Sequence, residues 1–173
     1  MAGQNFDGEV TKAVVDAGVL FDMLIINYAG KTSRHHGIEN LLEKLSQYLR
    51  KNPRAREEFL QFTHHITTFW ITSHVVGELK GLVSSRLKLH GEKFKDFWSS
   101  TLCFFREKKI KEELIQLVNM QEASLDKIGP VDLGLAMLAH QKGVVLLTND
   151  RLLAKYAWDQ GMKCKTMEQI LWI

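Results

Sequence analysis

The chain contains 173 residues, of which 45% are hydrophobic and 25% are charged, and its formal net charge is +3. This composition is that of a globular protein and excludes a disordered, collagen-like or coiled-coil protein. The length fits one domain, whose folding removes about 70% of the unfolded chain's surface from water. The two cysteines, Cys103 and Cys164, allow neither a disulfide framework nor a metal-site spacing, which is typical of a reducing compartment.

Two further features favour a cytoplasmic location. No uncharged apolar run reaches about 18 residues, so we expect no membrane-spanning helix and no membrane partner. Residues 1–9 are polar and acidic and lack the pattern of a signal peptide.

The first half of the chain alternates strand-like and helix-like segments. Residues 13–15 form a short apolar run without alternation, typical of a strand buried on both faces. Residues 67–72 are rich in β-branched and aromatic side chains and predict a second strand. Ser73 then suits the cap of the helix that follows. Apolar spacing predicts further helices over residues 19–28, 38–49 and 54–66.

The second half continues this alternation. Residues 88–120 are mostly helical by composition, and the pattern also allows a short strand around 109–117. Gly129 and Pro130 begin a helix that runs through His140. The remaining expected elements are strands at 144–148 and 162–166, a helix at 151–160 and a last helical turn up to Ile173. Because strands alternate with helices, we predict a single α/β domain with a largely parallel sheet.

Two acidic residues follow predicted strands directly. Asp16 comes after the first strand and Asp150 after the strand at 144–148. The carboxyl ends of parallel strands form the ligand crevice of an open sheet, so both side chains are candidates for that crevice. Each has an alternative role: Asp16 can cap the helix that follows it, and Asn149 or Asp150 can cap the helix at 151–160.

Two more acids lie near the same edge of the predicted sheet. Glu78 falls at the border of the apolar face of the helix after residues 67–72, and pairing with Lys80 is its alternative role. Asp132 lies in the first turn after Pro130, where a carboxylate also complements the helix dipole. Three other acids, Asp22, Glu122 and Asp126, are expected at the surface, and assisting the four acids is their alternative role.

Four converging carboxylates are a donor set that Mg²⁺ or Mn²⁺ prefers, because both ions bind hard oxygen ligands. Such ions activate water and orient a phosphodiester for in-line displacement. A basic segment, residues 80–111, adds nine lysines and arginines against three acids, with five aromatic residues interleaved. It can bind a polyanion; the alternative is a solvated face over buried aromatics. From this segment we take as nucleic-acid contacts Lys80, Arg86, Lys88, Lys93, Lys95, Lys108 and Lys109.

The four acids and their flanking residues resemble the four acidic positions of PIN domains. The segments that carry the resemblance are VVDAGVL around Asp16, ITSHVVGEL around Glu78, IGPVDLGLA around Asp132 and VVLLTND before and including Asp150. Their order and spacing match over residues 11 to 170, which is nearly the whole chain. One departure is Ala17 after the first aspartate, where PIN domains often carry a small polar residue.

The resemblance implies a three-layer α/β/α sandwich, a PIN-like domain over residues 1–173 with its core at about 11–170. It also implies Mg²⁺ or Mn²⁺ on the four acids, with Thr148 and Asn149 in support, and hydrolysis of RNA that leaves a 5′-phosphate and a 3′-hydroxyl. The chain is then a metal-dependent endoribonuclease. It is either a toxin of a toxin–antitoxin pair, with an antitoxin partner and a homodimeric state, or a stand-alone RNA-processing nuclease.

Two other functions remain open from the sequence. A PIN-like scaffold can bind RNA or a protein without cleaving either. A receiver domain carries a phosphorylated aspartate, but it needs a further acid beside the first strand, and the segment 13–20 has none besides Asp16.

Overall fold

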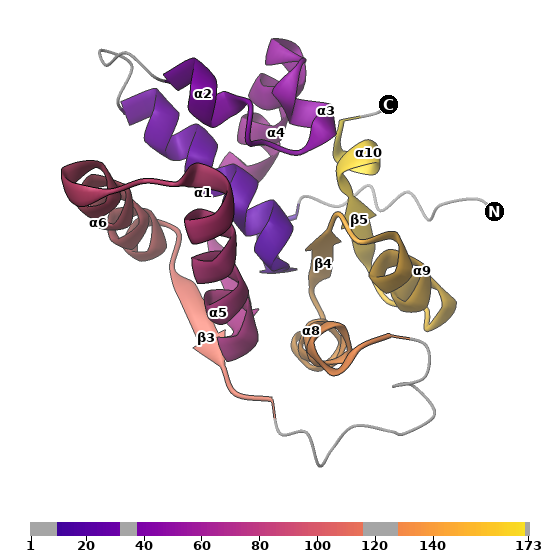
Figure 1. Ribbon diagram of the computed structural model, residues 1–173. Coiled ribbons are helices and arrows are strands. Elements are labelled where there is room, and N and C mark those ends of the chain that lie inside the picture. The colour runs from indigo at the N-terminus through magenta and orange to yellow at the C-terminus, as the bar shows by residue number, and fades with distance from the viewer. Residues whose placement is uncertain (1–9, 32–37, 116–127, 172–173) are drawn as a thin grey trace.

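Five parallel strands form the central sheet of the computed structural model, which describes residues 10–31, 38–115 and 128–171. Their order across the sheet is β3-β2-β1-β4-β5 (Figure 1). The strands are β1 (Lys12–Val15), β2 (Thr68–Thr72), β3 (Ile110–Glu113), β4 (Val145–Thr148) and β5 (Cys164–Thr166). Every residue of β2 and β4 is buried, as expected for strands covered by helices on both faces.

Helices cover both faces of this sheet, so the fold is the three-layer α/β/α sandwich that we predicted. One layer holds α1 (Ala17–Lys31), α4 (Pro53–His65), α5 (Ser73–Leu82) and α6 (Gly91–Glu107). The other layer holds α8 (Pro130–Lys142) and α9 (Arg151–Asp159), which pack on β1, β2, β4 and β5 (Figure 1). The shorter elements are α2 (Ile38–Leu42), α3 (Gln47–Arg50), the π-helical turn η1 (Val83–Leu87) and α10 (Met167–Ile170).

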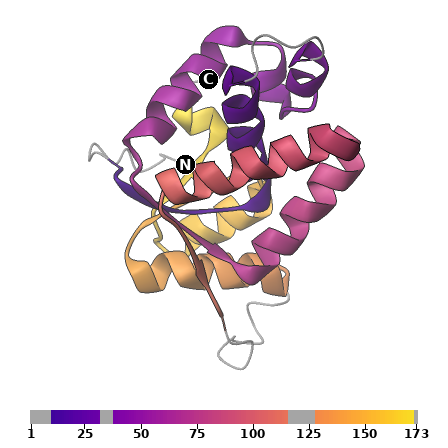
Figure 2. The same cartoon turned by 90° about the vertical axis from the view of Figure 1, so that its left-hand side faces the viewer.

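The core is built around α1, which is buried on nearly every side. Leu20, Phe21 and Leu24 of this helix are almost fully inaccessible to solvent, and so are Phe69 and Ile71 of β2. Figure 2 shows α6 crossing α1 on its way from the end of η1 to the start of β3. None of the helices in the described residues is long and apolar enough to cross a membrane.

The elements expected within the described residues are present, with two differences and one open choice settled; the expected helical residues 116–120 and the last two residues, 172–173, lie outside the described residues. The helix expected at 38–49 is two short helices, α2 and α3, separated at residues 43–46. The open choice at 109–117 is settled as a strand at Ile110–Glu113, which pairs with β2. The cap of α5 is Thr72 rather than Ser73. At the end of α8, Gly143 adopts the left-handed conformation (φ 64°) that ends the helix.

Candidate active site

The carboxyl-terminal edge of the sheet carries a row of polar side chains from neighbouring strands. Asp16 follows β1, and its amide donates to the carbonyl of Leu147 in β4 at 3.1 Å, so the β1–β4 ladder continues to Thr148. Continuing the β1–β2 register by two residues places Thr72 beside Asp16 on the other side. Paired residues in a parallel sheet project from the same face. Thr72, Asp16 and Thr148 therefore lie next to one another on one face.

This face is the one that α8 covers. Lys142 of α8 lies with its amine 5.9 Å from the ring centre of Trp70 and 2.7 Å from Glu113 Oε1. Trp70 and Thr72 are two residues apart in β2, so they share a face. Because α8 leads back into β4, its first turn lies at the carboxyl-terminal edge. Asp132, in that first turn, is thereby brought to the same edge as Asp16.

Asp16 is buried and held by three hydrogen bonds. Its Oδ1 accepts from the amide of Val19 at 2.7 Å, and its Oδ2 accepts from the amide of Asn149 at 3.0 Å and from the hydroxyl of Thr148. Burial raises its pKa; the three hydrogen bonds oppose that rise, and the charge of Asp150 adds to it. Asp16 therefore caps α1, as the alternative interpretation of the sequence expected, and lies at the sheet edge as well.

Asp150 is fixed in a similar way. It caps α9, with Oδ1 accepting from the amides of Leu152 at 2.7 Å and Leu153 at 2.9 Å. Its own amide donates to the hydroxyl of Thr148 at 2.9 Å. Thr148 therefore joins Asp16 to Asp150 by hydrogen bonds on both sides.

Glu78 and Asp132 are not tied down in this way. Within the described residues, neither carboxylate accepts a hydrogen bond or forms an ion pair. Burial and the charges of Asp150, Glu78 and Asp16 raise the pKa of Asp132 to about 6. Partial burial and the charge of Asp16 raise the pKa of Glu78, which His74 partly offsets. Asp132 is therefore repelled by the other three carboxylates, and Asp16 is also repelled by Asp150 and Glu78.

The four side chains do not form a preassembled metal cage. In the part of the chain that the structure describes, no three histidine, cysteine, aspartate or glutamate side chains come together as a metal-binding group. The donor set nevertheless fits a divalent cation, because its oxygen ligands are hard, and the described residues that stabilise its negative charge are hydrogen-bond donors to Asp16 and Asp150, with His74 acting on Glu78. Helix capping fixes the carboxylates of Asp16 and Asp150, whereas those of Glu78 and Asp132 can change orientation.

Asp22 was expected at the surface, and that expectation is wrong. It is 1% exposed, inside the apolar stretch of α1, where its Oδ1 accepts from the amide of Ser46 at 3.0 Å and its Oδ2 has no partner. Burial raises its pKa to about 6. A single aspartate within the apolar run at residues 19–26 was the signal that it lies in the core. The two other expected surface acids, Glu122 and Asp126, lie outside the described residues.

Thr72 was not among the site residues predicted from the sequence. Its side chain is 2% exposed and its hydroxyl has no hydrogen-bond partner. Although Thr72 is the N-cap of α5, its side chain does not accept from the first turn. Its position as the last residue of a strand, in register with Asp16, was the available signal.

The basic segment, residues 80–111, is split between two ends of the molecule. Lys93 and Lys95 are exposed on α6, with Phe94 37% exposed, whereas Phe97 is fully buried. Lys80 is exposed on α5, and Lys88 follows η1. Arg86, in η1, lies 5.7 Å from the ring centre of Phe21. Most of the interleaved aromatics are therefore packing residues rather than free stacking surfaces.

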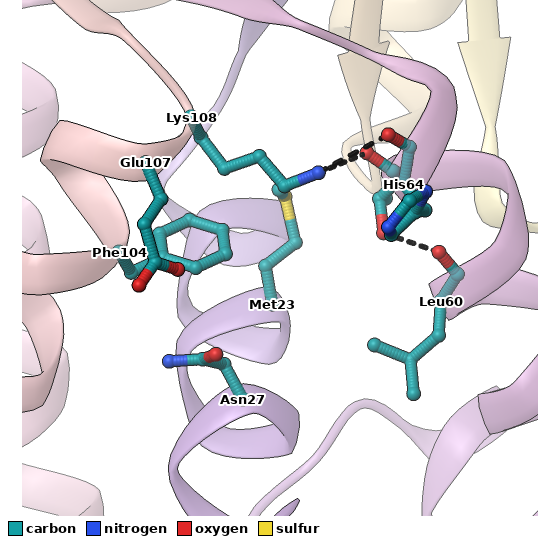
Figure 3. Close-up of a pocket in the computed structure, with 8 residues that line it drawn as sticks. Met23, Asn27, Leu60, His64, Phe104, Glu107 and Lys108 are labelled. Atoms are coloured by element: carbon teal, nitrogen blue, oxygen red, sulfur yellow. Dashed lines mark hydrogen bonds between the residues drawn. The ribbon is translucent and has the colours of Figure 1, made fainter. Parts of the chain in front are cut away.

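Lys108 and Lys109 precede β3 and so lie at the amino-terminal edge of the sheet, opposite the four acids. The amine of Lys108 donates to the carbonyls of Thr63 and His64 at the end of α4, both at 3.2 Å (Figure 3). These groups border a cavity of about 340 Å³ between α1, α4 and α6, with Met23 and Phe104 among its walls. The structure does not bring Lys108 or Lys109 beside the acids.

Comparison with models of known protein families gives no match, and comparison with curated proteins gives none. The functional assignment depends on the residues themselves.

Proposed function

We propose that this protein is a divalent-metal-dependent endoribonuclease of the PIN type. The observation that supports it most is the gathering of four carboxylates, from β1, α5, α8 and the end of β4, at one edge of a parallel sheet. Burial, together with the charges of the other three, raises the pKa of the fourth, Asp132, to about 6. Unbalanced negative charge of this kind is costly in a folded protein and is relieved by a bound cation.

Asp16, Glu78, Asp132 and Asp150 would hold Mg²⁺ or Mn²⁺, which supplies an activated water and neutralises charge on a phosphodiester. Thr148 and the Asn149 amide keep the Asp16 carboxylate in one orientation. Glu78 comes from a helix and not from a strand end, so it can shift toward a cation without disturbing a cap. The resemblance to PIN domains gives RNA as the substrate.

Cleavage assays would test this proposal. A set of labelled RNAs is incubated with the wild type, Asp16→Asn and Asp132→Asn, in Mg²⁺, in Mn²⁺ and in EDTA. Asp159→Asn, at an exposed position at the end of α9, controls for loss of one negative charge. We expect metal-dependent cutting that both site variants lose and the control keeps. Activity that survives in Asp16→Asn would contradict the proposal.

A scaffold that binds RNA or a protein without cleaving it is the second candidate. It is favoured by the missing metal cage in the described residues. RNA binding by the wild type with no cleavage in either metal would support it. A toxin role would in addition require an antitoxin partner, which purification from the native host would reveal.

A further inference from the structure

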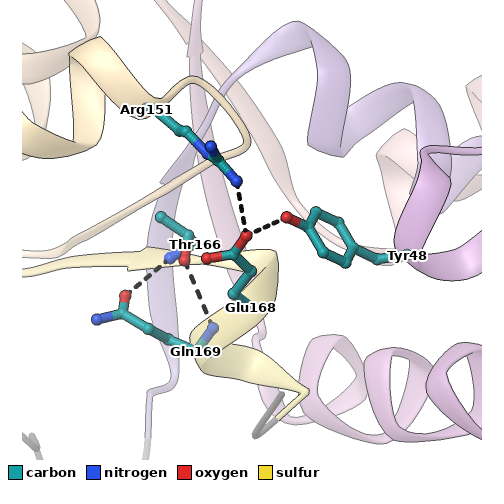
Figure 4. Close-up of polar contacts among 5 residues, drawn as sticks. All are labelled: Tyr48, Arg151, Thr166, Glu168 and Gln169. Atoms are coloured by element: carbon teal, nitrogen blue, oxygen red, sulfur yellow. Dashed lines mark hydrogen bonds and ion pairs between the residues drawn. The ribbon is translucent and has the colours of Figure 1, made fainter.

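A second charged constellation lies at the same edge of the sheet, beyond β4 and β5. Arg151 is the first residue of α9 and directly follows Asp150. Glu168 lies in α10, two residues after the end of β5. Tyr48 reaches the same place from α3 (Figure 4). Three segments that are far apart in the sequence therefore meet next to the start of α9, directly after Asp150.

All three side chains meet at one oxygen atom. Glu168 Oε1 accepts from the guanidinium of Arg151, whose Nη2 is 3.2 Å away, and from the hydroxyl of Tyr48 (Figure 4). These two hydrogen bonds lower the pKa of Glu168, so it stays ionised. The carboxylate holds one corner of the guanidinium. The Tyr48 hydroxyl also engages the guanidinium, and the Arg151 side chain is 82% exposed, so most of its N–H donors face solvent.

This ion pair has little value for stability. The Arg151 side chain is 82% exposed, and ion pairs between exposed side chains contribute little to stability. Arg151 is also the first residue of a helix, where the helix dipole disfavours a positive charge. Neither the ion pair nor the helix dipole therefore gives Arg151 a large stabilising role.

The ligand chemistry follows from the surroundings. A substrate with phosphate groups is repelled by four carboxylates and needs a fixed cation next to them. An arginine held at one corner presents its remaining N–H donors as a fork that matches two phosphate oxygens. We propose that Arg151 binds a backbone phosphate of the RNA strand next to the acidic site, with Glu168 and Tyr48 as positioning residues. This inference rests on the proposed function for the identity of the phosphate-bearing ligand.

The test is the affinity for a single-stranded RNA oligonucleotide of mixed sequence, measured by fluorescence anisotropy in EDTA so that no cleavage occurs. Arg151→Gln should bind about ten-fold more weakly, and the slope of log affinity against log salt should fall by about 0.7, as for one lost phosphate contact. Arg151→Lys should lose affinity but keep the slope, because the charge remains and the fork does not. Lys12→Gln, at the opposite end of β1, is the control for one lost charge and should behave as wild type.

A purely structural role is separated by a second variant. Glu168→Gln removes the charge of the partner of Arg151. If the pair has only a structural role, Arg151→Gln and Glu168→Gln should lower the melting temperature equally and leave the slope of log affinity against log salt unchanged. Wild-type affinity in Arg151→Gln, an equal loss in Lys12→Gln, or no RNA binding by the wild type would overturn the inference. Arg151-dependent binding without cleavage in either metal would overturn only the proposed nuclease. Cleavage by the wild type with normal binding by Arg151→Gln would overturn only the role of Arg151.

Discussion

Replacing Asp132 with asparagine should stabilise the metal-free protein at neutral pH. The ordinary aspartate pKa of 3.8 is raised to about 6 in the folded state by burial and by three neighbouring carboxylates. The folded protein therefore holds this proton more tightly than the unfolded chain does. Stability contributed by the protonated form is present below about pH 4 and is lost as the pH rises through 6.

The size of the gain follows from these values. The difference in pKa corresponds to about 3 kcal/mol for a group shielded from solvent. Asp132 is only half-buried, so screening reduces this to about 1.5 kcal/mol. Asparagine also loses the favourable interaction of a carboxylate with the first turn of α8, about 0.5 kcal/mol. The remainder, about 1 kcal/mol, raises the melting temperature of a domain of this size by about 2 to 4 °C.

The measurement is thermal unfolding in EDTA at pH 4 and at pH 7.5, for wild type, Asp132→Asn and the exposed control Asp159→Asn. The gain should be present at pH 7.5, absent at pH 4, and absent in the control at both. Adding Mg²⁺ at pH 7.5 should then raise the melting temperature of the wild type more than that of Asp132→Asn. A variant less stable than wild type at pH 7.5, or an equal gain at both pH values, would refute the mutual repulsion of the four acids.

Three further predictions concern other buried or bonded groups. Asp16→Asn should show no such gain in thermal unfolding at pH 7.5, because its Oδ2 accepts two hydrogen bonds that an amide nitrogen cannot accept; a rise of several degrees would contradict this. Asp22→Asn should stabilise the protein at pH 8 by up to about 3 kcal/mol and leave its stability unchanged at pH 4, because burial raises the pKa of Asp22 from 3.8 to about 6. Denaturant titration at both pH values measures this difference, and equal stability of variant and wild type at pH 8 would contradict the prediction. Lys108→Met should lower the melting temperature, since α4 loses two hydrogen bonds at its end, while RNA affinity stays near that of the wild type; a large affinity loss would place the RNA at the amino-terminal edge instead.

The fold was accessible from the sequence because its signals are local. Short apolar runs without polar alternation marked β1 and β4, and helical apolar spacing marked α1 and α4. The break between α2 and α3 was not accessible from the sequence, because apolar residues continue the helical spacing across residues 43–46. What holds that break is distant in sequence: the amide of Ser46 donates to Asp22, a buried acid on α1. A tertiary hydrogen bond of this kind leaves no pattern in the segment itself.

Asp16, Asp150 and Asp132 were candidates because they follow strands or lie in a first turn, and Glu78 because it borders an apolar helix face. Thr72 and Arg151 were not among the predicted site residues. Thr72 is inconspicuous in the sequence because its meaning depends on strand register. Arg151 is hidden in the same way, since its partners lie in α3 and α10. The position of Lys108 was also not predictable from the segment alone. Lys108 adds to the positive charge of residues 80–111, yet it lies before β3 and therefore at the edge of the sheet opposite the acids. Charge counted along the chain does not say which edge of the sheet receives it.

Capping and metal binding are not competing roles for Asp16 and Asp150. A helix that starts directly after a parallel strand brings its first amides to the carboxyl-terminal edge, so a capping aspartate is held there with few rotamers left. Asp150 uses one oxygen for the cap, and no bond within the described residues engages the other. Two fixed carboxylates would define where a cation sits, while Glu78 and Asp132 repel each other until it arrives. A site of this design lacks a finished cage before metal binds, and the repulsion that keeps it open contributes, together with the burial of Asp132, to the pH dependence that Asp132→Asn measures.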